Sequence, residues 1–107
     1  MRFLTLELSL EIISSLRIPV RKLRSFDSKL ADQICRAGSS ISLNLAEGNR
    51  RAGKDKQHHW RIAAGSADEV RTALKVAKAW GYLGDKDTRK PLELLDRCLA
   101  MLWKLTN

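Results

Sequence analysis

Residues 53–79 read GKDKQHHWRIAAGSADEVRTALKVAKA, and this stretch decides the fold. Its apolar positions recur at alternating steps of three and four residues, the spacing of a helix that packs along one face in a left-handed bundle. These positions are Trp60, Ala63, Ala67, Val70, Leu74 and Ala77. At about 1.5 Å of rise per residue, the helix would be roughly 40 Å long. The stretch therefore predicts one long helix that needs other helices to cover its apolar face.

A second helix is predicted just before it, from Ser28 to Glu47. Asp27 or Ser25 is a suitable N-cap, and Gly48 is expected to end the helix. Its apolar stripe consists of Leu30, Ile34, Ala37, Ile41 and Leu45. The middle of this helix is rich in glycine and serine, which are poor helix formers. We expect these small residues to permit the close approach of a neighbouring helix.

The chain begins with a segment, Phe3 to about Arg17, whose leucines alternate with polar residues as in a half-buried strand. The same residues also fit helical spacing, Leu and Glu are strong helix formers, and no hairpin turn follows. We therefore predict a first helix here and expect Pro19 to end it.

The last helix has an apolar arc too wide for one bundle to cover. It is predicted to begin near Asp87 or Thr88, with Pro91 in its first turn, and to run to about Leu105. Its apolar residues are Leu92, Leu94, Leu95, Cys98, Leu99, Met101, Leu102, Trp103 and Leu105. Large apolar surfaces that one chain leaves uncovered usually mark interfaces. The sequence thus predicts an all-α, antiparallel up-and-down four-helix bundle, one domain over residues 1–107, that forms a homo-oligomer.

Composition limits the classes of partner. The chain carries 20 Lys and Arg against 12 Asp and Glu, a net charge of +8, which favours polyanions such as RNA or DNA. Glu7 and Glu11 interrupt the apolar start that an export signal would need, and no run approaches the ~20 apolar residues of a membrane span. Cys35 and Cys98 lack a Cys-x-x-Cys spacing. We expect both to be reduced core residues of a cytoplasmic protein that has no membrane partner.

Positive charge gathers in two clusters and one stripe. The connector cluster surrounds the junction of the first two predicted helices and contains Arg17, Arg21, Lys22, Arg24 and Lys29, of which Arg21, Lys22 and Arg24 are candidate contacts. The turn cluster contains Arg50, Arg51, Lys54, Lys56 and Arg61, and the helix stripe contains Arg71, Lys75 and Lys78. In an up-and-down bundle the two clusters lie at opposite ends. Charge runs are commonly solvated faces, but the excess over acidic residues favours nucleic-acid binding.

Other polar residues on the two central helices invite a catalytic reading. Asn44, Glu47, Ser66 and Glu69 have no nucleophile and base pair or phosphate-binding loop beside them. We interpret them as a buried polar network with Arg36 as the charge partner. His58 and His59 lack the Glu-x-x-His units of di-iron bundles and are interpreted as surface residues near phosphates. The sequence therefore predicts no catalytic residue, no metal and no cofactor, and a protein that is not an enzyme.

Two runs resemble a known family. Residues 36–48, RAGSSISLNLAEG, resemble the Ser-Ile-x-x-Asn-Ile-Ala-Glu-Gly signature of bacterial four-helix-bundle proteins encoded by intervening sequences inside large-subunit ribosomal RNA genes. Residues 64–69, AGSADE, together with Leu74, Ala77 and residues 81–83, GYL, resemble the third helix of that family and its exit turn. The resemblance implies a cyclic homopentamer. It also implies kinship with Avd, the accessory variability determinant of diversity-generating retroelements, a basic ring that binds nucleic acid and a reverse transcriptase.

These observations lead to one expected function and two alternatives. We expect an accessory protein that binds structured RNA and works with a reverse transcriptase of a diversity-generating retroelement. Because aromatic residues make up 6% of the chain, we expect contacts mainly to phosphate and little stacking on bases. The alternatives are a scaffold that docks an acidic protein, and a ribosomal intervening-sequence protein of unassigned role.

Overall fold

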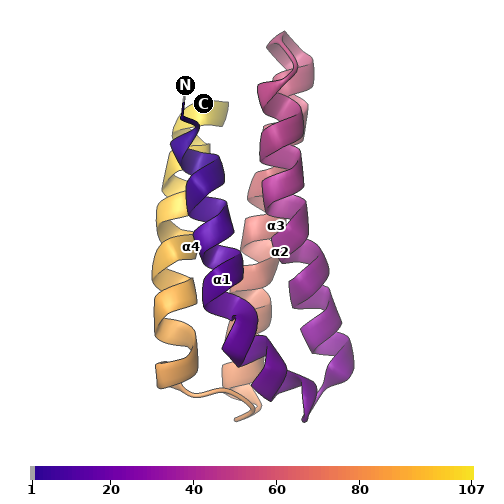
Figure 1. The fold of residues 1–107 in the computed structure, drawn as a ribbon, viewed down its shortest axis with the longest axis vertical. Helices are drawn as coiled ribbons and strands as arrows, with labels where there is room; N and C mark the ends of the chain where they lie inside the picture. The colour runs from indigo at the N-terminus through magenta and orange to yellow at the C-terminus, as the bar shows by residue number, and fades with distance from the viewer. Residues whose placement is uncertain (1) are drawn as a thin grey trace.

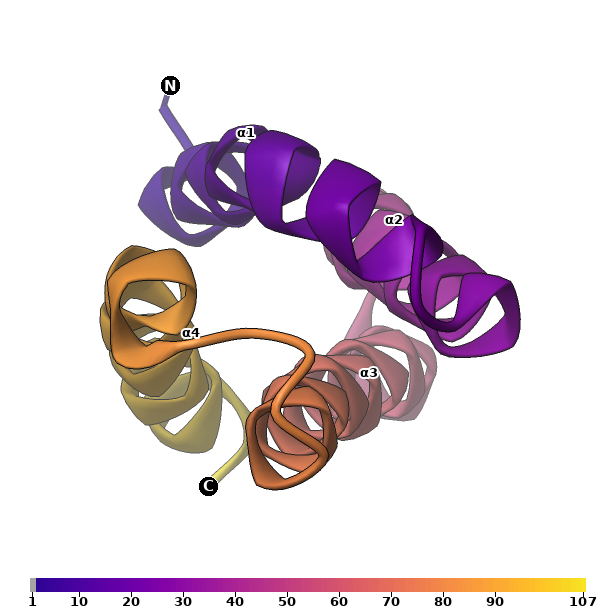
Figure 2. The ribbon, with the colours of Figure 1, turned by 90° about the horizontal axis from the view of Figure 1, so that it is seen from below.

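The computed structural model describes residues 2–107, and all its regular structure in that range is helical (Figure 1). The four helices are α1 (Leu4–Arg24), α2 (Ser28–Asn49), α3 (Gly53–Ala79) and α4 (Asp85–Thr106). Successive helices run in opposite directions, and viewed from below they form a square in which each helix packs on two neighbours (Figure 2). Helix α1 contacts α2 and α4, and α3 contacts the same two helices. The predicted all-α four-helix bundle is confirmed.

The long third helix has the predicted bounds, and its predicted face is buried. Each of the six apolar positions listed for residues 53–79 is at most 7% exposed. Gly53 starts the helix at φ 59° and Gly81 follows its end at φ 81°, the left-handed region that glycine adopts without strain. Backbone freedom at these two points gives α3 sharp ends.

Both prolines lie inside helices, so the prediction that Pro19 ends the first helix is wrong. Helix α1 continues to Arg24, and Pro91 is the seventh residue of α4 rather than part of its first turn. Proline inside a helix removes a backbone hydrogen bond and costs about 3 kcal/mol. Here each proline occupies a core position: Pro19 follows Leu16 by three residues, and Pro91 precedes Leu95 by four. Burial of the two rings offsets the missing hydrogen bonds.

The longer α1 shortens the connector to Ser25, Phe26 and Asp27. Asp27 is the N-cap of α2, because its carboxylate accepts a hydrogen bond from the Leu30 amide at 3.0 Å. Ser25 instead caps the C-terminus of α1, and its hydroxyl donates to the Lys22 carbonyl at 2.7 Å. Most of the connector cluster therefore lies on the last two turns of α1.

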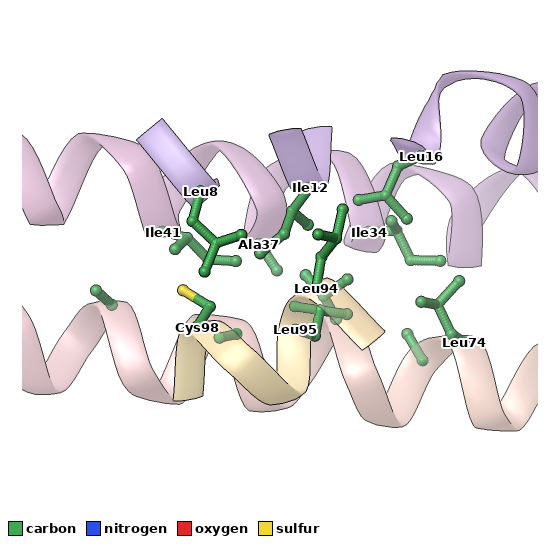
Figure 3. Packing of buried hydrophobic residues seen from close by; sticks show 14 of the residues in the cluster. Leu8, Ile12, Leu16, Ile34, Ala37, Ile41, Leu74, Leu94, Leu95 and Cys98 are labelled. Atoms are coloured by element: carbon green, nitrogen blue, oxygen red, sulfur yellow. The ribbon is translucent and has the colours of Figure 1, made fainter. Parts of the chain in front are cut away.

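The core is a continuous apolar cluster to which all four helices contribute (Figure 3). Ile12, Ile41, Leu74 and Leu95 are fully buried at its centre. Cys98 is buried as predicted, and burial raises the pKa of its thiol to about 11. The prediction for Cys35 is wrong: this thiol is exposed, because it lies one residue beyond the buried Ile34.

Helix α4 buries only the central part of its wide apolar arc. Leu94, Leu95, Cys98 and Leu102 are buried, whereas Trp103 is 68% exposed. Helix α1 likewise exposes Leu4, Leu10 and Ile18 by half or more. None of the helices in residues 2–107 has the length and apolarity needed to cross a membrane.

Candidate nucleic-acid interface

Positive charge is concentrated at the two ends of the bundle. The lower end, defined as residues 21–30 and 78–90, holds eight Lys and Arg against three Asp, a net charge of +5 (Figure 1). The upper end, defined as residues 2–8, 47–61 and 103–107, holds seven against three, a net charge of +4. The rest of residues 2–107 holds five basic and six acidic residues. The charge that would attract a polyanion therefore lies at the ends and not along the sides.

At the upper end, Arg51 is held between two carboxylates. Its guanidinium nitrogens donate to Glu47 at 2.8 Å and to Asp55 at 2.6 Å. The arginine lowers the pKa of both carboxyl groups, and they in turn raise the pKa of Arg51. Glu47 was predicted to join a buried network but lies half-exposed, because it pairs with the residue one turn further along the chain. Two carboxylates therefore hold Arg51 in place at the α2–α3 turn.

The other members of the turn cluster are more available. Arg50 and Lys54 are exposed and form no ion pair within residues 2–107. The Lys56 ammonium lies 5.1 Å from the centre of the Trp60 ring, a cation–π contact. Arg61 reaches the Thr106 carbonyl at 3.5 Å, at the C-terminus of α4. Within the turn cluster, the exposed cations that have neither an ion pair nor another side-chain contact of these kinds among the described residues are Arg50 and Lys54.

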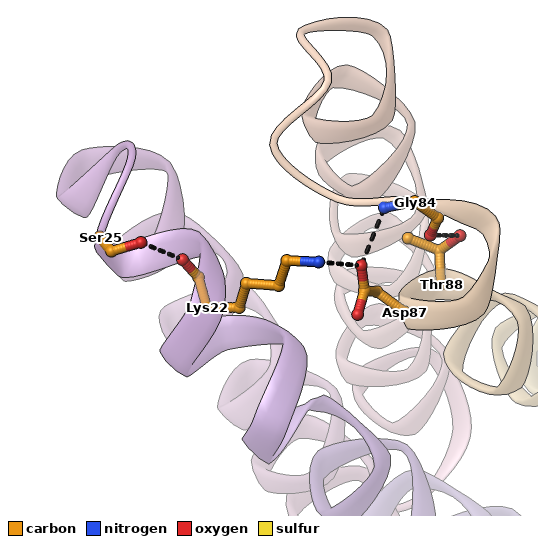
Figure 4. A network of polar contacts seen from close by, with 5 residues as sticks. All are labelled: Lys22, Ser25, Gly84, Asp87 and Thr88. Carbon is orange, nitrogen blue, oxygen red and sulfur yellow. Dashed lines mark hydrogen bonds and ion pairs between the residues drawn. The ribbon is translucent and has the colours of Figure 1, made fainter.

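At the lower end, ion pairs tie the helices together. The Lys22 ammonium of α1 donates to Asp87 of α4 at 2.8 Å, and the same carboxylate oxygen accepts from the Gly84 amide at 2.9 Å (Figure 4). The hydrogen bond from Gly84, and then that from Lys22, lower the pKa of Asp87. Arg24 pairs with Asp32 at 2.7 Å. Lys22 and Arg24 therefore have structural partners.

Other cations at the lower end keep their charge free for a ligand. Arg21, Lys29, Lys86, Arg89 and Lys90 are exposed and make no ion pair in the part of the chain that the structure describes. Arg21 also lines a groove between α1 and α2, together with Arg17. This end thus offers more unpaired cations than the turn cluster does.

The helix stripe is largely neutralised. Arg71 donates to Asp68 on its own helix at 2.7 Å and to Asp96 of α4 at 3.1 Å. Lys78 pairs with Asp85 at the start of α4. Lys75 alone of the three is exposed without an ion pair among the described residues. The stripe therefore fastens α3 to α4. Sequence spacing did not reveal the contact to Asp96, because this residue lies 25 positions from Arg71.

A small polar network joins α2 and α3. The Ser66 hydroxyl donates to the Ser40 hydroxyl at 2.8 Å, and the Asn44 amide donates to the Ser40 carbonyl at 3.0 Å. The Asn44 oxygen lies 3.1 Å from Nδ1 of His59. Sequence reasoning found Asn44 and Ser66 but missed Ser40 and His59, although Ser40 precedes Asn44 by one helical turn. The network contains no acidic side chain.

Glu69 and Arg36 were predicted to belong to this network, and the structure places neither in it. Both are exposed, and neither forms an ion pair within residues 2–107. The next residues along the chain, Val70 and Ala37, are the buried ones. His58 is also exposed, and its ring meets that of His59 edge-on at 5.5 Å.

Comparison with known proteins places this fold and its sequence motifs in one family. Residues 5–104 match the family model of the 23S rRNA-intervening sequence protein. The chain belongs to this family. In this intervening-sequence protein, the Ala-Glu-Gly run of residues 46–48 ends at Gly48, where the Trp60 ring of α3 lies against α2.

A solved structure has the same fold. It is a protein of unknown function from the S23 ribosomal protein family of Bacteroides thetaiotaomicron, with 20% identity and a TM-score of 0.86. The alignment covers 96% of this chain and 98% of that one. Among curated proteins, none matches the sequence. The family and the fold are therefore shown.

Proposed function

We propose that this intervening-sequence protein binds nucleic acid without catalysing a reaction, mainly through phosphate contacts at the two ends of the bundle. The observation that carries the proposal is the charge distribution: both ends are strongly positive, and the sides are not. Arg50 and Lys54 at one end, and Lys29 and Lys86 at the other, keep their charge free of protein carboxylates within residues 2–107. Unpaired, flexible cations release counterions from a phosphate backbone, which drives such binding.

The proposed assembly is a homo-oligomeric ring, which the family resemblance implies to be a pentamer. Exposed apolar side chains on α1 and α4 support it, because one copy leaves Ile18 at 73% and Trp103 at 68% exposure. A ring repeats each basic end around a rim, so weak sites act together. Structured RNA is the proposed ligand, and a reverse transcriptase of a diversity-generating retroelement is the proposed protein partner.

Salt dependence tests the binding. The logarithm of the affinity for an RNA or DNA duplex should fall linearly with the logarithm of the salt concentration, with a slope of about 0.9 per phosphate contact on duplex DNA. The double variant Arg50→Ala and Lys54→Ala should flatten this slope. The matched control, Arg36→Ala and Arg97→Ala, removes two exposed charges from the sides of the bundle and should leave the slope nearly unchanged.

Three results would contradict the proposal. Equal losses of affinity in both double variants would mean that net charge, and not the basic ends, controls binding. Affinity that does not respond to salt, or no binding at all at low salt, would favour the docking of an acidic protein instead. A reverse transcriptase gene and a repeated template beside this gene would support the retroelement partner.

Light scattering tests the ring. The wild-type protein should have a mass several times that of one chain at micromolar concentration, and Ile18→Glu should lower it without unfolding the bundle, since Ile18 is exposed. Leu94 is 3% exposed, so Leu94→Glu would unfold the chain and would not test the interface. A monomeric wild type rejects the ring.

A further inference from the structure

Three aromatic side chains form one stack at the lower end of the bundle. Phe26 lies in the α1–α2 connector, and Trp80 and Tyr82 lie in the α3–α4 turn. The Phe26 and Tyr82 ring centres are 5.3 Å apart with planes 11° from parallel. The Trp80 and Tyr82 centres are 6.2 Å apart with planes 18° from parallel. The fold therefore assembles a three-ring surface from two segments that are distant in the sequence.

The two outer rings lie largely in water. Phe26 is 56% exposed and Trp80 is 69% exposed, while Tyr82 between them is half-buried. The core at this end is already closed by Leu23 and Leu83, which are 0% and 3% exposed. Aromatic rings left in water beside a closed core contribute little to folding, because the hydrophobic effect rewards only the area removed from water. The two outer rings are therefore accessible to a binding partner.

The surroundings of the stack identify the chemistry of that partner. The stack lies on the lower end, which holds eight Lys and Arg against three Asp. Lys29 in the first turn of α2 and Lys86 in the first turn of α4 are exposed and have no ion-pair partner among the described residues. Flat π-surfaces at the same end of the bundle as free cations suit a base attached to phosphates, since rings stack on bases and cations bind the backbone. An acidic protein would match the charge but would not need parallel rings.

We propose that the Phe26, Tyr82 and Trp80 stack binds an unpaired base of single-stranded nucleic acid, with the free lysines of the lower end on the flanking phosphates. The proposal rests on the nucleic-acid binding proposed above and adds a preference for unpaired over duplex segments at this end. It revises the expectation drawn from composition that stacking is minor. Aromatic residues make up only 6% of the chain, but the fold brings three of them together.

The test compares two probes of equal length, a labelled oligouridine strand and an RNA duplex, by fluorescence anisotropy over one series of salt concentrations. Trp80→Ala should weaken binding of the single strand about ten-fold, the order expected for loss of one stacked base, and should leave duplex binding unchanged. The salt slope should also be unchanged, because stacking releases no counterions. Trp80→Phe should retain most of the affinity, and Trp80→Leu, which is apolar but not aromatic, should not.

Trp103→Ala is the matched control. Trp103 has the same side chain and nearly the same exposure, 68% against 69%, but lies at the upper end. The measured quantity is the ratio of single-strand to duplex affinity, which cancels any effect of assembly on both probes. This ratio should fall in Trp80→Ala and Phe26→Ala and stay at the wild-type value in Trp103→Ala.

The outcomes separate this proposal from the one that it rests on. If the wild-type protein binds both probes, an unchanged ratio in Trp80→Ala or full affinity in Trp80→Leu overturns the base-stacking site. Phosphate binding would still stand. Binding of neither probe at low salt overturns both. Loss of an acidic protein partner in Trp80→Ala, without any change in the ratio, would likewise overturn the base-stacking site and assign the rings to protein docking.

Discussion

Gly48 of α2 lies against Trp60 of α3 so closely that a Cβ on Gly48 would be 2.5 Å from Cδ1 of the indole ring. The ring is 7% exposed, and its N–H donates to the Leu45 carbonyl at 3.2 Å, which fixes its position. Gly48 was predicted to end the second helix, yet it lies inside α2, which continues to Asn49. The glycine is needed here for close packing of two helices and not for a turn.

Gly48→Ala should therefore destabilise the protein by about 1–3 kcal/mol, because the extra methyl group must displace a fixed ring or the Lys56 carbonyl, 3.2 Å away. Urea unfolding measures the change. Gly65→Ala is the control, since nothing lies within 4 Å of a Cβ at this position of α3. The free energy of unfolding of that variant should rise by about 0.5–1 kcal/mol, because alanine has a higher helix propensity than glycine. Increased stability in both variants would show that the atoms around Gly48 move aside at little energetic cost.

Ser9 and Ser42 form a buried link between α1 and α2. Their hydroxyl oxygens are 2.8 Å apart, and the Ser9 hydroxyl also donates to the Leu6 carbonyl at 2.7 Å. Ser42 must then be the donor in the pair. Ser9→Ala leaves the buried Ser42 hydroxyl without an acceptor and should lower the free energy of unfolding by about 1–2 kcal/mol. Ser42→Ala removes a bond that Ser9 only accepts and should lower it by about 0.5 kcal/mol.

A double-mutant cycle in urea checks this asymmetry. The double variant should lose clearly less stability than the sum of the two single variants, because it leaves no buried hydroxyl without a partner. Additive losses would mean that the two hydroxyl groups are not coupled.

Asn44→Ala should destabilise the protein by about 1 kcal/mol, because it breaks the network to Ser40 and leaves a ring nitrogen of His59 unpaired. Glu69→Ala should change stability by less than about 0.5 kcal/mol, since Glu69 is exposed. Thermal unfolding followed by circular dichroism compares the two variants. An equal loss in both would restore Glu69 to the network, contrary to the structure.

Asp87 should make stability depend on pH in the acid range. Its folded pKa lies below the ordinary value of 3.8, because the ionised carboxylate accepts from the Gly84 amide and from Lys22. A depressed folded pKa adds stability that is present above the unfolded pKa and is lost as pH falls through the folded pKa. Asp87→Asn keeps an acceptor and removes the charge.

The wild type should therefore melt at a higher temperature than Asp87→Asn at pH 7, by the equivalent of about 1 kcal/mol. The difference should shrink as pH falls below about 4. A difference that stays constant down to pH 2 would show that shape, and not charge, is what Asp87 supplies.

Local patterns predicted most of the fold. The bounds of α3, the N-cap at Asp27 and the buried stripe through Trp60 and Leu74 all follow from helical spacing and capping, which depend on residues within a few positions of each other. Pro19 is the exception, because local rules assign it to a helix end. Only the burial of its ring against other helices explains why α1 continues.

By itself, the sequence determined that this chain is a basic bundle of four helices, because an apolar period of about 3.6 residues is a property of the chain alone. Only the tertiary structure decided which charges are free and which are paired, since Arg71 meets Asp96 and Lys22 meets Asp87 across helices. It also brought Phe26 beside Tyr82. Such contacts join residues far apart along the chain, and their distances are set only when the helices pack.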